Sequence, residues 1–221
     1  MSELWDALGT VVDPELDQPI TDLGFVCAAV IADDHVHVRL RLPTYFCAPN
    51  FAYLMVADAY EAVRGLAGSV DVQLEDHFAA EEINAGVAAS AGFAGSFPGE
   101  AVGELDELRV VFQRKAYLAS LDRLCMSVAA PADLSLGEVP PSPALTSLLR
   151  RRAALGLDCS PESPLLLDDT GAAITAAEAP LRLRYARSVR VSIEGNAGFC
   201  RGLLHTRYPE AVGNEIVLHN S

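Results

Sequence analysis

The apolar side chains of the first eighty residues repeat at helical spacing in some segments and at strand spacing in others. Residues 3–12 carry them on one side of a helix, which should stop at Asp13-Pro14 because a residue before proline avoids the helical region. Residues 25–32 and 35–42 have strand character. The Asp33-Asp34 pair between them predicts a tight hairpin.

Helical spacing returns over residues 50–66, and alternation returns over residues 70–74. The order helix, strand, strand, helix, strand predicts a small sheet with its helices on one face. We therefore expect an α+β domain over residues 1–80.

Residues 81–103 are rich in glycine and alanine, a composition that predicts a linker or mobile connection. The extension over residues 104–221 reads as mainly helical, with helical steps over 104–129 and 144–155. Residues 181–204 fit both a strand and a helix, and we favour a helix. The predicted fold class is α+β, followed by a mainly helical C-terminal extension.

Charge narrows the range of partners. The 221 residues carry a net charge of −14, and residues 1–80 alone carry thirteen acidic and three basic side chains. An acidic chain lacks the surplus of lysine and arginine that nucleic acids and anionic membranes require, so neither is an expected partner. The chain start has no cationic segment followed by a long apolar one, so we expect a cytoplasmic protein.

Five cysteines are spread widely, without a CxxC pair. Their odd number and wide spacing are unlike a disulfide framework, so we expect free thiols. A zinc or cluster site made of local cysteines is not expected.

Three short motifs carry the chemistry of the amino-terminal segment. They are Asp13-Pro14-Glu15-Leu16, then Ile20-Thr21-Asp22-Leu23-Gly24-Phe25-Val26, then Pro43-Thr44-Tyr45-Phe46-Cys47. In this order they resemble the PaaD-like and SufT-like metal-sulfur cluster assembly family, over about residues 3–78. The resemblance implies a role in building or delivering iron-sulfur clusters. Pro43-Thr44-Tyr45 looks like the phenylacetate-pathway branch, whose members assist assembly of an oxygenase system.

Cys47 is the residue that the resemblance singles out as a ligand of iron or of a transient iron-sulfur cluster. It follows a predicted strand and precedes a predicted helix, where free amides and the helix dipole favour a thiolate. One thiolate cannot hold a cluster that normally takes four protein ligands. The missing donors would come from a second copy in a homodimer, from a target protein, or from nearby oxygen and nitrogen atoms.

The nearby candidates are Asp13, Glu15, Asp22 and His77, whose donors would favour Fe(II). We take the three carboxylates as part of the cofactor-binding site, and Cys47 with His77 as metal ligands. Cys47 and the acids have structural alternatives. Cys47 can be a buried core residue, and the acids can form turns. Farther along, Asn196 and Cys200 lie one helical turn apart and are interpreted as a polar packing contact.

Motifs of common enzymes are missing: the sequence has no P-loop, no HExxH and no GxSxG. The sequence therefore predicts an accessory protein, not an enzyme, that helps install an iron or iron-sulfur centre in an apo-metalloenzyme such as an oxygenase. One alternative is a metal-free adaptor or folding helper that binds oxygenase subunits. A second is an enzyme with Cys47 as its nucleophile.

Overall fold

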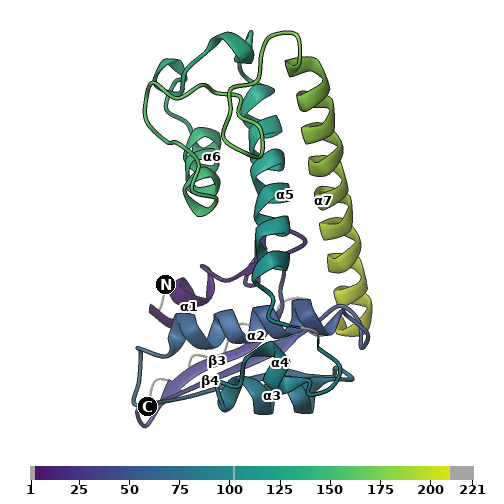
Figure 1. Cartoon of the computed structure of the whole chain (residues 1–221). Coiled ribbons are helices and arrows are strands. Elements are labelled where there is room, and N and C mark those ends of the chain that lie inside the picture. The colour runs from purple at the N-terminus through teal and green to yellow at the C-terminus, as the bar shows by residue number, and fades with distance from the viewer. Residues whose placement is uncertain (1–2, 102, 210–221) are drawn as a thin grey trace. The chain divides into compact units, whose positions relative to one another are not determined.

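The computed structural model of the chain describes residues 3–101 and 103–209 (Figure 1). The chain forms two compact units. Unit 1 contains the residues up to Asp106 together with those from Asn196 onward, and unit 2 contains Glu107–Gly195. The long helix α7 (Ala179–Arg207) therefore begins in unit 2 and ends in unit 1.

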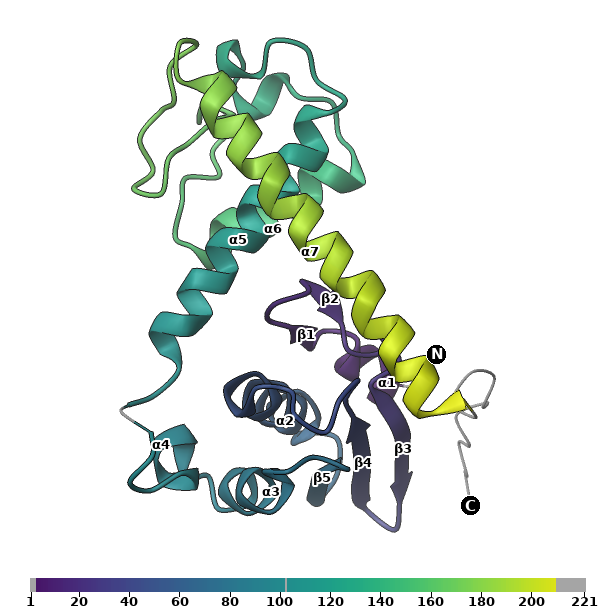
Figure 2. The ribbon, with the colours of Figure 1, turned by 90° about the vertical axis from the view of Figure 1, so that its right-hand side faces the viewer.

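Unit 1 is built around a three-stranded sheet with the order β3-β4-β5 (Figure 2). β3 (Val26–Ala32) pairs antiparallel with β4 (His35–Arg41), which pairs parallel with β5 (Ser69–Glu75). Asp33 and Asp34 connect the first two strands, both with positive φ, as a tight two-residue hairpin turn requires. A second, two-stranded sheet pairs β1 (Val12–Asp13) with β2 (Gln18–Pro19).

One face of the larger sheet is buried. Val36, Val38 and Leu40 of β4 are at most 1% exposed, and α2 (Pro49–Val63) and α3 (Ala80–Ala88) contact β5 on this side (Figure 2). The alternate residues of β4 lie on the other face. There Arg39 and Arg41 form ion pairs with acids of β5, as cross-strand neighbours can. With α1 (Glu3–Leu8), these elements confirm the predicted α+β order.

The glycine-rich segment 81–103 is not a linker, contrary to its composition. It contains most of α3 and all of α4 (Gly92–Ser96), and Ile83 and Val87 are buried in the core of unit 1. A Cβ added to Gly86 would come within 1.8 Å of the Ser96 Oγ. Glycine here permits close packing between two short helices, a use that composition alone does not distinguish from flexibility.

Unit 2 is mainly helical, as predicted. It contains α5 (Asp106–Cys125), two 3-10 turns (Pro131–Asp133 and Leu136–Glu138), α6 (Pro143–Ala154) and the first part of α7. Arg152 on α6 is fully buried, and its guanidinium donates hydrogen bonds to three carbonyl oxygens and to the Ser163 hydroxyl. These bonds hold the segment that follows α6 against that helix.

The last part of α7 belongs to the core of unit 1. Ala197, Leu204 and Tyr208 are buried in the same apolar cluster as the sheet residues. Arg207 donates to the carbonyl oxygens of Leu42 (3.1 Å) and Asp76 (2.5 Å). The predicted domain limits of 1–80 and 104–221 therefore need correction: the amino-terminal domain is completed by residues more than a hundred positions away.

No helix in the described part of the chain combines the length and the apolar character needed to cross a membrane.

Candidate functional site

Cys47 lies in the loop between β4 and α2, directly before the N-cap residue Ala48. Pro49 occupies the first turn of α2, where its missing N–H costs nothing. The thiol is half-buried and free, and its Sγ is 3.3 Å from the Thr44 Oγ1. All five cysteines are free thiols, as the sequence predicted.

The Cys47 side chain lines a pocket of about 170 Å³ in unit 1. Two acids line the same pocket, Asp13 at the end of β1 and Glu15 in the loop that follows it, and so does Cys200 from α7. The rest of the wall is mainly apolar and consists of Leu16, Phe25, Leu42, Pro43, Ala48, Phe51 and Met55. The thiol therefore shares a small pocket with negative side chains, and is not enclosed by hydrocarbon alone.

Asp13 has two functions in this geometry. Its Oδ1 accepts hydrogen bonds from the backbone N–H groups of Glu15 (2.9 Å) and Leu16 (2.8 Å), which fixes the turn. Its side chain is also buried, and burial raises the pKa of Asp13 to about 6, although the two amides oppose the shift. A carboxyl group with this pKa gains or loses a proton near neutral pH.

His77, the predicted metal ligand, has both ring nitrogens in hydrogen bonds to backbone groups. Its Nδ1 accepts a hydrogen bond from the Ala79 N–H, so the proton lies on Nε2, which donates to the Cys47 carbonyl oxygen over 2.7 Å. Burial lowers the pKa of His77, and the nearby Arg207 charge lowers it further. Both ring nitrogens are thus bound to backbone, and the residue positions the Cys47 loop.

Asp22 is also displaced from its predicted place. It is exposed in the turn that precedes β3, outside the wall of the Cys47 pocket. The turn is closed by Gly24, whose φ of 77° is left-handed, and this geometry directs the chain back into the sheet. Asp22 fits the structural alternative of a turn residue.

Cys200 is the pocket residue that the sequence did not assign to the site. It was interpreted as a packing partner of Asn196, one helical turn earlier, but the two have different roles. The Asn196 amide donates to Glu15 (3.4 Å), and Cys200 faces the pocket. Burial raises the pKa of Cys200 to about 11, and Asp13, Cys47 and Glu15 contribute in the same direction. Helical periodicity shows which face of a helix a residue occupies, but not which part of the fold contacts that face.

The donors do not form a complete cage for a metal ion. Within residues 3–101 and 103–209, no three side chains among His, Cys, Asp and Glu are grouped so that they could hold one. The pocket instead offers two soft sulfur donors and two hard carboxylates in a mainly apolar wall. This donor set fits iron that brings part of its own ligands, such as sulfide.

Three exposed aromatic side chains lie beside the site. Tyr45, Phe46 and Phe78 are 47%, 77% and 47% exposed, and their ring centroids lie 5.0 to 6.3 Å apart. Tyr45 and Phe46 immediately precede Cys47 in the loop. Clustered exposed aromatics are typical of surfaces that contact another macromolecule.

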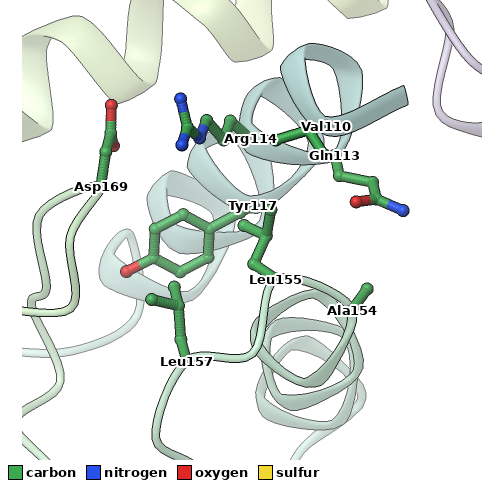
Figure 3. Close-up of a pocket in the computed structure, with 8 residues that line it drawn as sticks. All are labelled: Val110, Gln113, Arg114, Tyr117, Ala154, Leu155, Leu157 and Asp169. Atoms are coloured by element: carbon green, nitrogen blue, oxygen red, sulfur yellow. The ribbon is translucent and has the colours of Figure 1, made fainter. Parts of the chain in front are cut away.

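Unit 2 has a pocket of its own, of about 130 Å³ (Figure 3). In it, Tyr117 of α5 lies beside Leu155 and Leu157, and Arg114 of the same helix extends on the side of Asp169, which belongs to a separate loop (Figure 3). The Tyr117 hydroxyl donates to the Leu167 carbonyl oxygen, and burial raises the Tyr117 pKa. This pocket therefore combines a buried tyrosine, whose hydroxyl is bound to backbone, with an exposed acid.

Comparison with known proteins gives one family match, which lies within unit 1. Residues 2–74 match the model of the iron-sulfur cluster assembly protein family. The match confirms the resemblance read from the three motifs, and it supports a role in iron-sulfur cluster assembly. It spans about one third of the chain and contains Asp13, Glu15 and Cys47, whereas Cys200 lies outside it. No curated protein and no solved structure matches the chain.

Proposed function

We propose that the protein assists the assembly or delivery of an iron or iron-sulfur centre to an apo-enzyme, with an oxygenase as the client. The observation that carries the proposal is the position of Cys47. In the segment that matches the cluster assembly family, its thiol opens into a pocket that also holds Asp13 and Glu15. A soft donor beside hard donors suits iron that is bound and then released.

The metal centre is cargo in this proposal, and the chain turns over no small substrate. The thiols of the pocket hold it, and the carboxylates offset its positive charge or take up a proton displaced from a thiol. Asp13 is suited to the second task because its pKa of about 6 lies close to neutral pH.

The exposed aromatic cluster of Tyr45, Phe46 and Phe78 supports a client that docks at the mouth of the site. Two of its members are the residues just before Cys47, so a protein seated on them would bring its own ligands near the cargo. We assign the cluster to the docking of the apo-enzyme. A metal-free adaptor would use the same surface but would not need the Cys47 thiol. Replacing that thiol therefore distinguishes the two functions.

An enzymatic function with Cys47 as the nucleophile has less support. A nucleophilic cysteine needs an adjacent base, and the nearby His77 uses both of its ring nitrogens for backbone hydrogen bonds. The hydrogen-bonding neighbour of the Cys47 Sγ is the Thr44 hydroxyl, which is not a base at neutral pH.

The test is anaerobic reconstitution of the full chain with ferrous iron and sulfide, followed by iron and sulfide counting, absorption spectroscopy and transfer to apo-ferredoxin as the acceptor. We expect a cluster on the wild-type chain that moves to the acceptor, and its loss in Cys47→Ser. Cys159→Ser is the matched control, because Cys159 is exposed in unit 2. Equal iron in wild type and Cys47→Ser would contradict the role of Cys47, and no cluster on either protein would favour the metal-free adaptor.

A further inference from the structure

Two cysteines from distant parts of the sequence face one small pocket in unit 1. Cys47 comes from the loop before α2, and Cys200 comes from the last turns of α7. Both pack at the edge of the same apolar core, and the pocket they share measures about 170 Å³. The match to the cluster assembly family ends at residue 74, so it says nothing of Cys200.

The position of Cys200 is built into the structure by several contacts. Ala197 and Leu204, which flank it on α7, are buried in the core of unit 1. The Asn196 amide donates to Glu15, and Arg201 hydrogen-bonds to Gln18. These contacts hold the residues on both sides of Cys200 against the β1–β2 hairpin, which carries the pocket acids.

Cys47 and Cys200 line the same pocket, and the charge of Cys47 is part of the electrostatic surroundings of Cys200. Burial is the main cause of its raised pKa, and the charges of Asp13, Cys47 and Glu15 add to it. All four of these side chains line the one pocket. A metal centre bound by the two thiols would offset this repulsion, because its positive charge opposes the negative charges around Cys200.

The number of protein ligands in the pocket determines which kind of metal centre it can bind. The described residues offer no group of three donors for a metal ion, so a mononuclear site made by this chain alone is not supported. In a [2Fe-2S] cluster each iron takes two bridging sulfides and two thiolates. Two cysteines therefore satisfy one iron and leave the other iron to outside ligands.

We propose that Cys47 and Cys200 together ligate one iron of a [2Fe-2S] cargo cluster, while thiols from a client or a small carrier ligate the other iron. This inference rests on the proposed function and names its second ligand. Loading is a ligand exchange without redox change: two iron-sulfur bonds to Cys47 and Cys200 form, and two bonds to carrier thiolates break. The protons lost by the cysteines pass to the released thiolates.

Such a half-site would explain how the cluster leaves. The two outward ligand positions can be taken by client cysteines before the bonds to Cys47 and Cys200 break, so the cluster is never without ligands. The apolar part of the wall, which includes Phe25, Leu42 and Met55, would keep water from the bound side.

The first experiment tests the thiol pair without iron. Phenylarsine oxide binds two neighbouring thiols at once, and mass spectrometry of the full chain measures the adduct. We expect one adduct on the wild-type chain and on Cys159→Ser, and none on Cys47→Ser or Cys200→Ser. An adduct that persists in Cys200→Ser would overturn the pairing. The wild-type result does not depend on whether a variant folds.

The second experiment reconstitutes the same four proteins anaerobically with ferrous iron and sulfide, with circular dichroism as the check on folding. Because outer-shell changes already cost about 10-fold to 100-fold in metal affinity, we expect Cys200→Ser to retain iron at least about tenfold less well than wild type. A wild-type level of cluster in Cys200→Ser would overturn the Cys200 assignment and leave the proposed function intact. An arsenical adduct without any cluster on wild type would overturn both.

Discussion

His77 and Cys47 are joined by a hydrogen bond of 2.7 Å from the imidazole Nε2 to the Cys47 carbonyl oxygen. A second bond, from the Phe78 N–H to the Tyr45 carbonyl oxygen (3.2 Å), runs between the same two segments. The turn after β5 thereby holds the loop that carries the candidate thiol. His77, which the sequence predicts as a metal ligand beside Cys47, is hydrogen-bonded to the backbone that presents the thiol.

Replacing His77 should loosen this loop in a pH-dependent way. His77→Ala leaves the Cys47 carbonyl and the Ala79 amide without their partner, at a cost of about 1 to 3 kcal/mol in the free energy of unfolding. Burial holds the folded pKa of His77 below its ordinary value of about 6.5, so its contribution to stability is present above that pH and is lost as pH falls.

The measurement is urea unfolding of wild type, His77→Ala and His77→Gln at pH 7.5 and 5.5. We expect wild type to lose more stability on acidification than His77→Gln, which has no titrating group. Equal pH dependence in the two proteins would contradict the neutral, buried state of His77.

Burial of the ionised Asp13 carboxylate should cost stability near neutral pH, and this cost should be absent in acid. Its folded pKa of about 6 lies above the ordinary value, so the folded state binds the proton more tightly than the unfolded state. The resulting stability is full below about pH 4 and is lost as pH rises through about 6. Asp13→Asn keeps an oxygen to accept the two backbone bonds and removes the charge.

We therefore expect Asp13→Asn to exceed wild type in stability by about 2 to 3 kcal/mol at pH 7.5, as an order of magnitude, and to equal it near pH 4. Chemical denaturation at the two pH values checks this. A variant that is less stable than wild type at pH 7.5 would show that the ionised carboxylate is stabilised by the fold. A buried acid with this raised pKa is a candidate for a functional site.

Arg207 should determine whether the end of α7 stays attached to the sheet domain. Its guanidinium donates to the carbonyl oxygens of Leu42 and Asp76, which Arg207→Met cannot reproduce. We expect faster hydrogen exchange in α7 beyond Asn196 and faster alkylation of Cys200, with a stability loss of about 1 to 3 kcal/mol. Arg184→Met, at an exposed position of the same helix, is the control. Equal exchange in the two variants would argue against the attachment.

Gly86 tests the packing of the glycine-rich segment. An alanine Cβ there would meet the Ser96 Oγ at 1.8 Å, so α3 and α4 would have to move apart. We expect Gly86→Ala to lower stability by about 1 to 3 kcal/mol, as overpacking does. Gly103→Ala, whose Cβ would meet nothing within 4 Å, should change stability little. Thermal unfolding of both variants decides, and equal melting temperatures would favour a flexible linker.

The sequence by itself determined the secondary-structure elements of the amino-terminal segment and its resemblance to the cluster assembly family. Alternation in β4, helical spacing in α2, the Asp33-Asp34 turn and the three motifs are local patterns, and the structure and the family match agree with them. The helical choice for residues 181–204 is also confirmed. Such features follow from the backbone geometry of neighbouring residues, which sequence spacing reports directly.

Tertiary structure alone decided which side chains meet. Asp13, Glu15 and Cys47 share a pocket as predicted, whereas Asp22 lies on the surface and the nitrogens of His77 are bound to backbone. Cys200 enters the pocket because the end of α7 buries Ala197 and Leu204 against the sheet domain. That burial is a long-range hydrophobic contact, and no local period in the sequence specifies the partner of an apolar helical face.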